Sequence, residues 1–207
     1  MKKPASVLLF AAALALGASA AAAEERTPVR SLREIRQAHV VVQRWDVSCG
    51  AAALATLLSY QLPRPVSEQT VAQAMLGRTD PLRVKVRGGF SLLDLKRYAL
   101  SVGFTADGYA RVPLEELDGL APAIVPLILY GFPHFVVYRG RVGDYVLVAD
   151  PAYGNRMIEV AKFRAAWQNI AFVVTRSQAN SATGAPRVED QDYARVSADM
   201  IRSALRR

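Results

Sequence analysis

Cysteine and histidine are the scarcest reactive residues in this chain, with one cysteine and two histidines among 207 residues. A single cysteine, Cys49, cannot form an internal disulfide, so a disulfide-stapled scaffold is excluded. One cysteine together with histidines as far apart as His39 and His134 gives no ligand cluster of the usual zinc spacing. We therefore expect no metal and no cofactor.

Long apolar runs are also missing beyond the N-terminus. No later stretch approaches the ~20 apolar residues of a membrane helix, so we expect no transmembrane segment in the mature chain. The first residues combine Lys2 and Lys3 with an apolar run over 7–16 and small residues through Ala23. This is the layout of a secretory signal peptide. We expect residues 1–23 to be removed and the protein to be periplasmic, with an uncleaved signal anchor as the less favoured alternative.

The excess of basic residues is modest. Lys and Arg outnumber Asp and Glu by 26 to 18, giving a formal charge of +8 that includes Lys2 and Lys3. The arginines are scattered from Arg26 to Arg207 without a basic patch interleaved with aromatic residues, so we expect no nucleic-acid partner. With 52% hydrophobic and 21% charged residues, the composition is that of a folded globular chain.

Helical patterns precede strand patterns along the sequence. Helix formers or apolar residues at helical spacing predict three helices, over 49–58, 67–76 and 91–102. From residue 123 the period changes to that of strands. The expected strands cover 124–130, 134–139, 145–149, 156–160 and 171–175. Helices first and antiparallel strands second predict an α+β domain.

The ends of the chain differ in composition from this domain, which we place at 38–176. Residues 24–37 are a charged lead-in segment. Residues 177–190 are rich in Ser, Ala, Thr, Gly and Pro and are typical of a linker. Residues 191–207 have apolar residues at helical spacing among arginines, which predicts an amphipathic C-terminal helix. We expect this helix to dock on the domain or to lie in solvent rather than on a membrane or partner.

Cys49 is the candidate nucleophile. An unpaired thiol in an oxidising compartment is a liability unless it is buried as a small hydrophobe or kept for its chemistry, and by itself the cysteine fits both interpretations equally. The helix expected to begin at Cys49 favours a thiolate there through its unpaired N–H groups and dipole. Gly50 removes a side chain from the surface that a substrate would approach.

His134 is the better of the two candidate bases. It begins an expected strand of the C-terminal sheet, on the wall opposite Cys49, whereas His39 lies before the nucleophile and is expected to be an ordinary surface residue. Asp150 ends the strand that should pair with the His134 strand, where a carboxylate can fix the imidazole tautomer. The alternatives are a structural histidine and a simple Asp-Pro turn.

Gln43 is the candidate donor to an oxyanion. It lies six residues before Cys49, a spacing that lets its amide reach back to the helix N-terminus and join the backbone N–H of Cys49. A neutral amide donates without adding a charge that titrates. Taken alone, Gln43 is more simply interpreted as a polar residue at a strand end.

These residues and their surroundings resemble peptidase family C39, the papain-like peptidases that trim double-glycine leaders in bacteriocin exporters. The resemblance covers roughly residues 38–175. It implies a papain-like fold with N-terminal helices packed on a C-terminal antiparallel sheet. It also implies that Cys49 is the nucleophile, His134 the base, Asp150 the orienting carboxylate and Gln43 the oxyanion donor. The matching elements are Gln43-x5-Cys49-Gly50-Ala51-Ala52-Ala53-Leu54, His134-Phe135-Val136-Val137 and Val148-Ala149-Asp150-Pro151.

The chain departs from the family pattern in two ways. Many exporter peptidases have an aspartate directly before the cysteine, where this chain has Ser48, and Asp46 is the candidate replacement. Exporter versions are fused to a transporter, whereas this sequence shows no membrane span and no phosphate-binding loop. It is more similar to the stand-alone exported C39-like proteins, which include the accessory peptidase of functional-amyloid fimbria operons.

The resemblance implies an exported thiol endopeptidase that acts on a secreted or periplasmic protein or leader peptide. Small residues such as Gly-Gly are the candidate cleavage site, and secretion or fimbria assembly is the candidate context. A transglutaminase-like or amidase fold uses Cys, His and Asp in the same order, but Gln43 at its spacing disfavours it. The alternative from another class is a C39-like accessory module that binds a substrate with little or no proteolysis. The pattern predicts no oligomeric state.

Overall fold

The computed structural model describes residues 29–176. The expected signal peptide at 1–23, the linker at 177–190 and the C-terminal helix at 191–207 lie outside the described residues, and so does the first part of the lead-in segment. They stay predictions. The second part of the lead-in forms helix α1, Leu32–Gln37, whose Ser31 cap and Glu34 bond each other reciprocally.

Helices come first and strands follow, as the sequence predicts. After α1 come α2 (Cys49–Tyr60), α3 (Glu68–Leu76), α4 (Pro81–Arg87) and α5 (Leu92–Ser101). The sheet consists of β1 (Phe104–Ala110), β2 (Ala123–Leu129), β3 (Phe132–Val142), β4 (Tyr145–Asp150), β5 (Gly154–Glu159) and β6 (Ile170–Arg176). The short helices α6 (Leu114–Leu117), η1 (Asp118–Leu120) and α7 (Val160–Ala166) lie in its connections.

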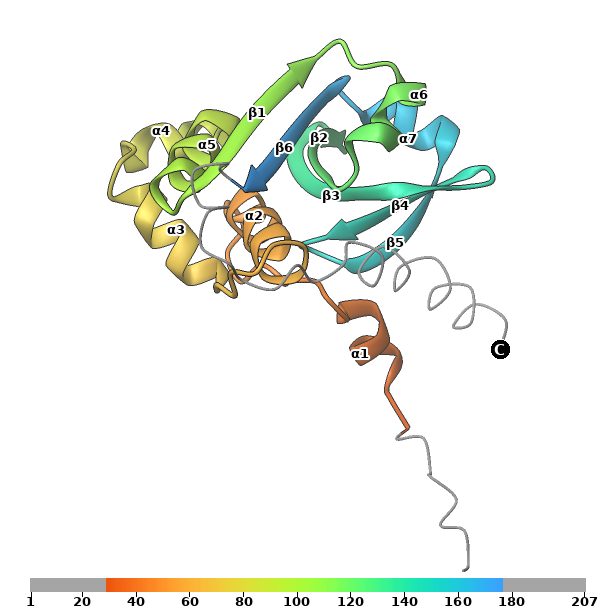
Figure 1. Ribbon diagram of the computed structural model, residues 1–207, viewed down its shortest axis with the longest axis horizontal. Coiled ribbons are helices and arrows are strands. Elements are labelled where there is room, and N and C mark those ends of the chain that lie inside the picture. The colour runs from red at the N-terminus through yellow and green to blue at the C-terminus, as the bar shows by residue number, and fades with distance from the viewer. Residues whose placement is uncertain (1–28, 177–207) are drawn as a thin grey trace, which may run out of the picture.

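All strand pairs are antiparallel, in the order β1-β6-β2-β3-β4-β5. The predicted α+β class is therefore confirmed. Consecutive strands from β2 to β5 pair with their neighbours in sequence, while β6 enters between β1 and β2 from the end of the domain. Figure 1 shows α3, α4 and α5 gathered at one end of the molecule, with α2 between them and the sheet.

The predicted starts of two helices follow from serine caps. The hydroxyl of Ser67 accepts from the backbone N–H of Thr70 at the start of α3, and the hydroxyl of Ser91 accepts from Asp94 at the start of α5. Helix α4 was not predicted from the sequence, because it is short and only Val84 of it is buried. Its bounds come from the Asp80 cap, from Pro81 at the first turn and from Gly88 in the left-handed conformation.

One expected strand ends earlier than predicted. We expected residues 156–160 to be a strand, but β5 ends at Glu159 and Val160 begins helix α7. The helix is favoured because it buries Phe163 in the core, where the ring packs against Tyr138 and Trp167. Strand β1 was not predicted, since most of its side chains are exposed and it lacks a long apolar alternation.

Helix α2 is the centre of the packing. All its residues from Cys49 to Leu58 are buried, because it contacts α3 and α5 on one side and β3 and β4 on the other. Small residues permit this close approach. A Cβ atom at Gly50 would lie 3.2 Å from both Leu95 and Phe135, so a larger residue there would push the helix from its neighbours. A second core on the other face of the sheet lies beneath α6 and α7.

Gly154 offers a test of how α1 is fastened to the sheet. Its φ of 82° is in the left-handed region, and an added Cβ would lie 2.5 Å from the backbone oxygen of Arg36. We expect Gly154→Ala to lower the free energy of unfolding by roughly 2 kcal/mol or more, through backbone strain and overlap. Urea denaturation measures the change. Gly108→Ala is the control, since nothing lies within 4 Å of that Cβ position, and an equal loss in both variants would contradict the prediction.

Candidate active site

Cys49 lies at the first turn of α2 and is 4% exposed. The turn contains no acidic residue, and among the residues that the structure describes Ser48 makes no side-chain capping bond to it. The backbone N–H groups at this helix end are therefore not satisfied by a cap within the described chain. They are available to stabilise a thiolate or an oxyanion.

The Ser48 hydroxyl is drawn to another partner instead. It contacts the carboxylate of Glu68 on α3 and lies 2.7 Å from the backbone oxygen of Trp45. Glu68 is 3% exposed and also accepts a bond from the backbone N–H of Arg44, at 2.9 Å. The carboxylate next to the nucleophile loop is thus that of Glu68, whereas Asp46, the candidate from sequence, is exposed. Glu68 fastens the loop that leads into Cys49.

His134 and Asp150 meet across two paired strands. The β3–β4 register pairs Val137 with Ala149, which puts His134 and Asp150 on the same face and diagonal to each other. The imidazole Nε2 lies 2.8 Å from Asp150 Oδ1. Because Asp150 occupies Nε2, Nδ1 is the imidazole nitrogen left to face Cys49, whose side chain raises the pKa of the imidazole. The structure therefore brings these three predicted residues together.

The surroundings of His134 favour its charged form. Burial by itself lowers the pKa of the imidazole, but the hydrogen bonds and charges of Asp150 and Cys49 outweigh it and raise the pKa to about 9. Burial raises the pKa of Asp150, whereas the bonds from His134, Ala152 N–H and Arg156 more than offset this, so its pKa is lowered. At neutral pH the site holds an imidazolium beside a carboxylate.

Gln43 lies where the two halves of the site meet. Its backbone N–H donates to the oxygen of Pro151 at 2.9 Å, beside Asp150, and its side-chain Nε2 donates to the oxygen of Trp45 at 3.1 Å. The amide thus borders the loop before Cys49, with one N–H of Nε2 used by Trp45. Within residues 29–176, Gln43 Oε1 is buried and has no hydrogen-bond partner.

His39 is separate from this arrangement. Its side chain makes an edge contact with the Tyr60 ring at 5.3 Å, and its backbone oxygen accepts a bond from Arg139. Burial lowers the pKa of His39, and the charges of Arg139 and Arg30 lower it further. The pKa values of the two histidines are therefore shifted in opposite directions.

Two residues that contact the site were not predicted from the sequence. Arg156 Nη1 donates to Asp150 Oδ2 at 2.9 Å, and Glu68 holds the loop before Cys49. The sequence did contain an indication of Arg156. An arginine shortly after the Asp-Pro turn lies on the strand that pairs with the strand ending in Asp150. Glu68 had none, since a surface-type residue in the first turn of a helix gives no indication of burial.

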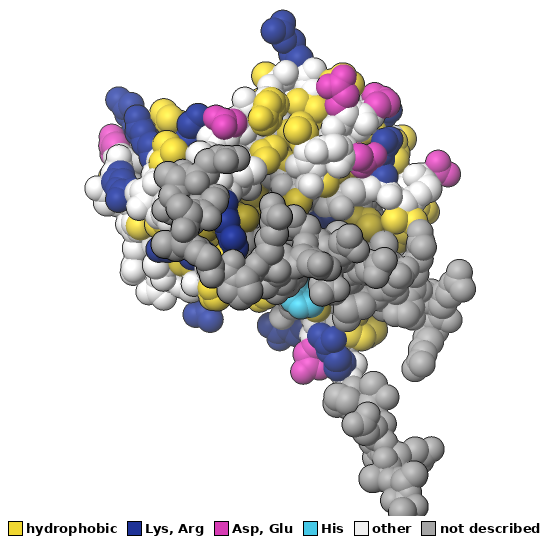
Figure 2. Space-filling model, in the orientation of Figure 1, with side chains coloured by type: hydrophobic (Ala, Val, Ile, Leu, Met, Phe, Trp, Pro, Cys, Tyr) yellow, Lys and Arg dark blue, Asp and Glu magenta, His cyan; other side chains and the backbone are white. Residues whose placement is uncertain are grey.

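The described residues show neither a metal-binding cluster nor a membrane-spanning helix. Residues 29–176 contain no group of three His, Cys, Asp or Glu side chains that could hold a metal ion. None of their helices combines the length and apolar character of a membrane span. On the face shown in Figure 2, Lys and Arg side chains are scattered among neutral and apolar ones.

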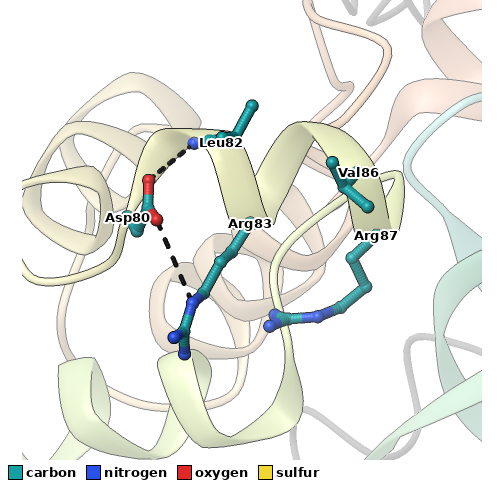
Figure 3. Close-up of a pocket in the computed structure, with 5 residues that line it drawn as sticks. All are labelled: Asp80, Leu82, Arg83, Val86 and Arg87. Atoms are coloured by element: carbon teal, nitrogen blue, oxygen red, sulfur yellow. Dashed lines mark hydrogen bonds and ion pairs between the residues drawn. The ribbon is translucent and has the colours of Figure 1, made fainter.

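A pocket on α4 is lined by Asp80, Leu82, Arg83, Val86 and Arg87 (Figure 3). Asp80 caps the helix at the N–H of Leu82 and lies 4.0 Å from Arg83, while Arg87 reaches Asp94 of α5 at 3.2 Å. Its charged residues are engaged in these local contacts. The pocket contains neither the thiol nor the imidazole.

Comparison with known sequences gives a consistent family. The model of the peptidase C39 family matches residues 37–179. A probable functional amyloid protease FapD of Pseudomonas aeruginosa is 46% identical over 147 residues, and one of Pseudomonas fluorescens is 41% identical over 146. Each alignment covers 70% of this chain, which spans 64% of the length of these relatives.

Solved structures give the same fold. A double glycine motif protease from an AMS/PCAT transporter, in complex with its leader peptide, matches with a TM-score of 0.55 and 28% identity, covering 67% of this chain and 91% of that one. The peptidase domain of Streptococcus ComA matches with a TM-score of 0.57 and 19% identity, covering 67% and 98%. These likenesses confirm the predicted papain-like fold.

The opposite pKa shifts of His134 and His39 can be measured directly. We expect His134 to titrate near pH 9 and His39 below its ordinary ~6.5, in an NMR titration with His39→Ala as the assignment control. Since the folded pKa of His134 lies above its unfolded value, its contribution to stability is full below pH ~6.5 and is lost as pH rises through about 9. A His134 that titrates at or below pH ~6.5 would contradict this.

Proposed function

The chain belongs to the peptidase C39 family, and we propose that it is a thiol endopeptidase in which Cys49 is the nucleophile, His134 the base and acid, Asp150 the orienting carboxylate and Gln43 an oxyanion donor. The observation that carries the proposal is the position of His134, whose Nε2 is hydrogen-bonded to Asp150 while its imidazole lies close enough to Cys49 for the charges of the two side chains to interact. This is the geometry that a nucleophile, a base and its orienting group require.

In the first half of the reaction, the thiolate of Cys49 attacks the scissile carbonyl carbon. The carbonyl oxygen becomes an oxyanion, which accepts bonds from the backbone N–H of Cys49 and from the second N–H of Gln43 Nε2. His134 then gives its Nδ1 proton to the leaving amine nitrogen as the carbon–nitrogen bond breaks. The product is a thioester between Cys49 and the substrate, with a neutral imidazole beside it.

In the second half, a water molecule attacks the thioester. The neutral His134 takes a proton from that water at Nδ1, and the carbon–sulfur bond breaks to release the acid and the Cys49 thiolate. The imidazolium is thereby restored. Throughout, Asp150 holds Nε2, which keeps Nδ1 directed toward the reacting atoms.

The substrate we propose is an exported protein or leader peptide in the periplasm. Three observations support it: the signal-peptide pattern at residues 1–23, the similarity to two probable functional amyloid proteases and the likeness to a double glycine motif protease in complex with a leader peptide. We infer that cleavage follows small residues such as Gly-Gly. The partner system is one for secretion or fimbria assembly.

A cellular comparison tests the activity and the substrate together. Cells that carry the wild-type protein are expected to release a peptide that is missing from cells with Cys49→Ala, when periplasmic and secreted peptides are compared by mass spectrometry. The purified protein should then cut a synthetic peptide that spans the mapped site, and Cys49→Ala should not. Binding of that peptide without cleavage by wild-type protein would favour the accessory binding module instead.

The role of Gln43 separates catalysis from positioning of the substrate. We expect Gln43→Ala to lower kcat by ~100-fold or more, with KM and the rate of Cys49 alkylation nearly unchanged, because alkylation forms no oxyanion. Steady-state kinetics and iodoacetamide labelling measure the two effects. Circular dichroism must first show that the variant is folded, since the substitution removes the bond from Gln43 Nε2 to the Trp45 oxygen. A folded variant with wild-type kcat would remove Gln43 from the oxyanion site.

A further inference from the structure

The carboxylate of Asp150 divides its two oxygens between two neighbouring strands. Oδ1 accepts from His134 Nε2 of β3 and from the backbone N–H of Ala152, while Oδ2 accepts from Arg156 Nη1 of β5 at 2.9 Å. The side chain of Asp150 is completely buried. A buried carboxylate is stable as an anion only with such partners, and the bond from Arg156 on Oδ2 adds to those from His134 and Ala152 in lowering the pKa of Asp150.

The sheet register explains why Arg156 reaches this carboxylate. Asp150 pairs with Gly154 and Val148 pairs with Arg156, so Asp150 and Arg156 are diagonal neighbours on one face of the sheet. His134 of β3 is the diagonal neighbour of Asp150 on the same face, across the other edge of β4. The residue directly opposite Asp150 is a glycine and has no side chain to block the guanidinium. The three side chains form one row across β3, β4 and β5.

Arg156 is also held from its other side. Its Cζ atom lies 4.8 Å from the centroid of the Tyr153 ring, which belongs to the turn between β4 and β5. The Arg156 side chain is 38% exposed, so a surface ion pair alone would fix it weakly. The aromatic face and the buried carboxylate together confine the guanidinium to one place.

We propose that Arg156 is a positioning residue for the peptidase reaction: by holding Oδ2 of Asp150, it keeps Oδ1 directed at His134 and the carboxylate ionised. The proposal rests on the proposed function, because it assigns Arg156 a role relative to the base His134. Arg156 touches neither the thiol nor the imidazole and acts only through Asp150.

The proposal predicts a decrease in the pKa of His134, which the loss of a positive charge alone would not give. Removing a nearby cation should by itself raise the pKa of an imidazole. If Arg156 holds the carboxylate that stabilises the imidazolium, removing it should instead lower the pKa of His134 from about 9. The charged groups that bear on His134 are Asp150 and Cys49, and both are kept in the experiment.

The experiment compares Arg156→Met, Arg156→Lys and Arg141→Met. We expect Arg156→Met to lower kcat by ~10- to 100-fold, with little change in KM, and to lower the NMR-measured pKa of His134. Arg156→Lys should restore most of both, because only Nη1 bonds Asp150. Arg141 makes an ion pair with the partly exposed Asp118, at 2.6 Å, and Arg141→Met should change neither quantity. A folded Arg156→Met with unchanged kcat, or with an unchanged or raised pKa of His134, would overturn the proposal.

A second variant guards against a folding defect. If Arg156→Met does not fold, Tyr153→Leu removes only the exposed ring that confines the guanidinium. The same decreases in kcat and in the pKa of His134 are then expected, at smaller size. Their absence would overturn the proposal as well. The titration of His134 needs no turnover, so it tests Arg156 even if wild-type protein cleaves no peptide, a result that would contradict the proposed function alone.

Discussion

A carboxylate with none of its surface in contact with water persists as an anion only if its neighbours replace the hydration that it has lost. Asp150 is such a group, and its replacement comes from His134, Arg156 and the backbone of Ala152. His134 and Arg156 depend on the antiparallel register of β3, β4 and β5, because that register sets which side chains are diagonal neighbours, whereas the Ala152 bond is local to the turn after β4. A shift of one residue would turn His134 or Arg156 to the opposite face. The charge of Asp150 therefore depends on the register of the sheet.

The helical half makes a complementary demand. Helix α2 must approach the sheet closely, and its small residues allow this. Its first turn must also stay uncapped if its N–H groups are to face an anion, and here the Ser48 hydroxyl is directed to Glu68 rather than to the helix. A capping serine would compete for the same donors. Glu68 thus performs, from α3, a function that keeps the helix end free.

The sequence predicted the parts of this protein that depend on local patterns. The serine caps of α3 and α5, the buried α2 and the strands from β2 to β4 follow from caps and apolar periodicity. Strand β1 did not, because it pairs with a strand that is distant in sequence, β6, and leaves most of its side chains in solvent. Cys49, His134 and Asp150 were predicted to act together from residue type and spacing, and the structure brings their side chains together. Glu68 became visible only through a contact that spans 20 residues.

The position of Gln43 shows why the two halves cannot be treated separately. Its backbone N–H bonds Pro151 in the sheet half, while its side chain bonds Trp45 in the loop that leads into Cys49. A movement of α2 away from the sheet would stretch one of these bonds or turn the amide, in addition to separating the thiol from the imidazole.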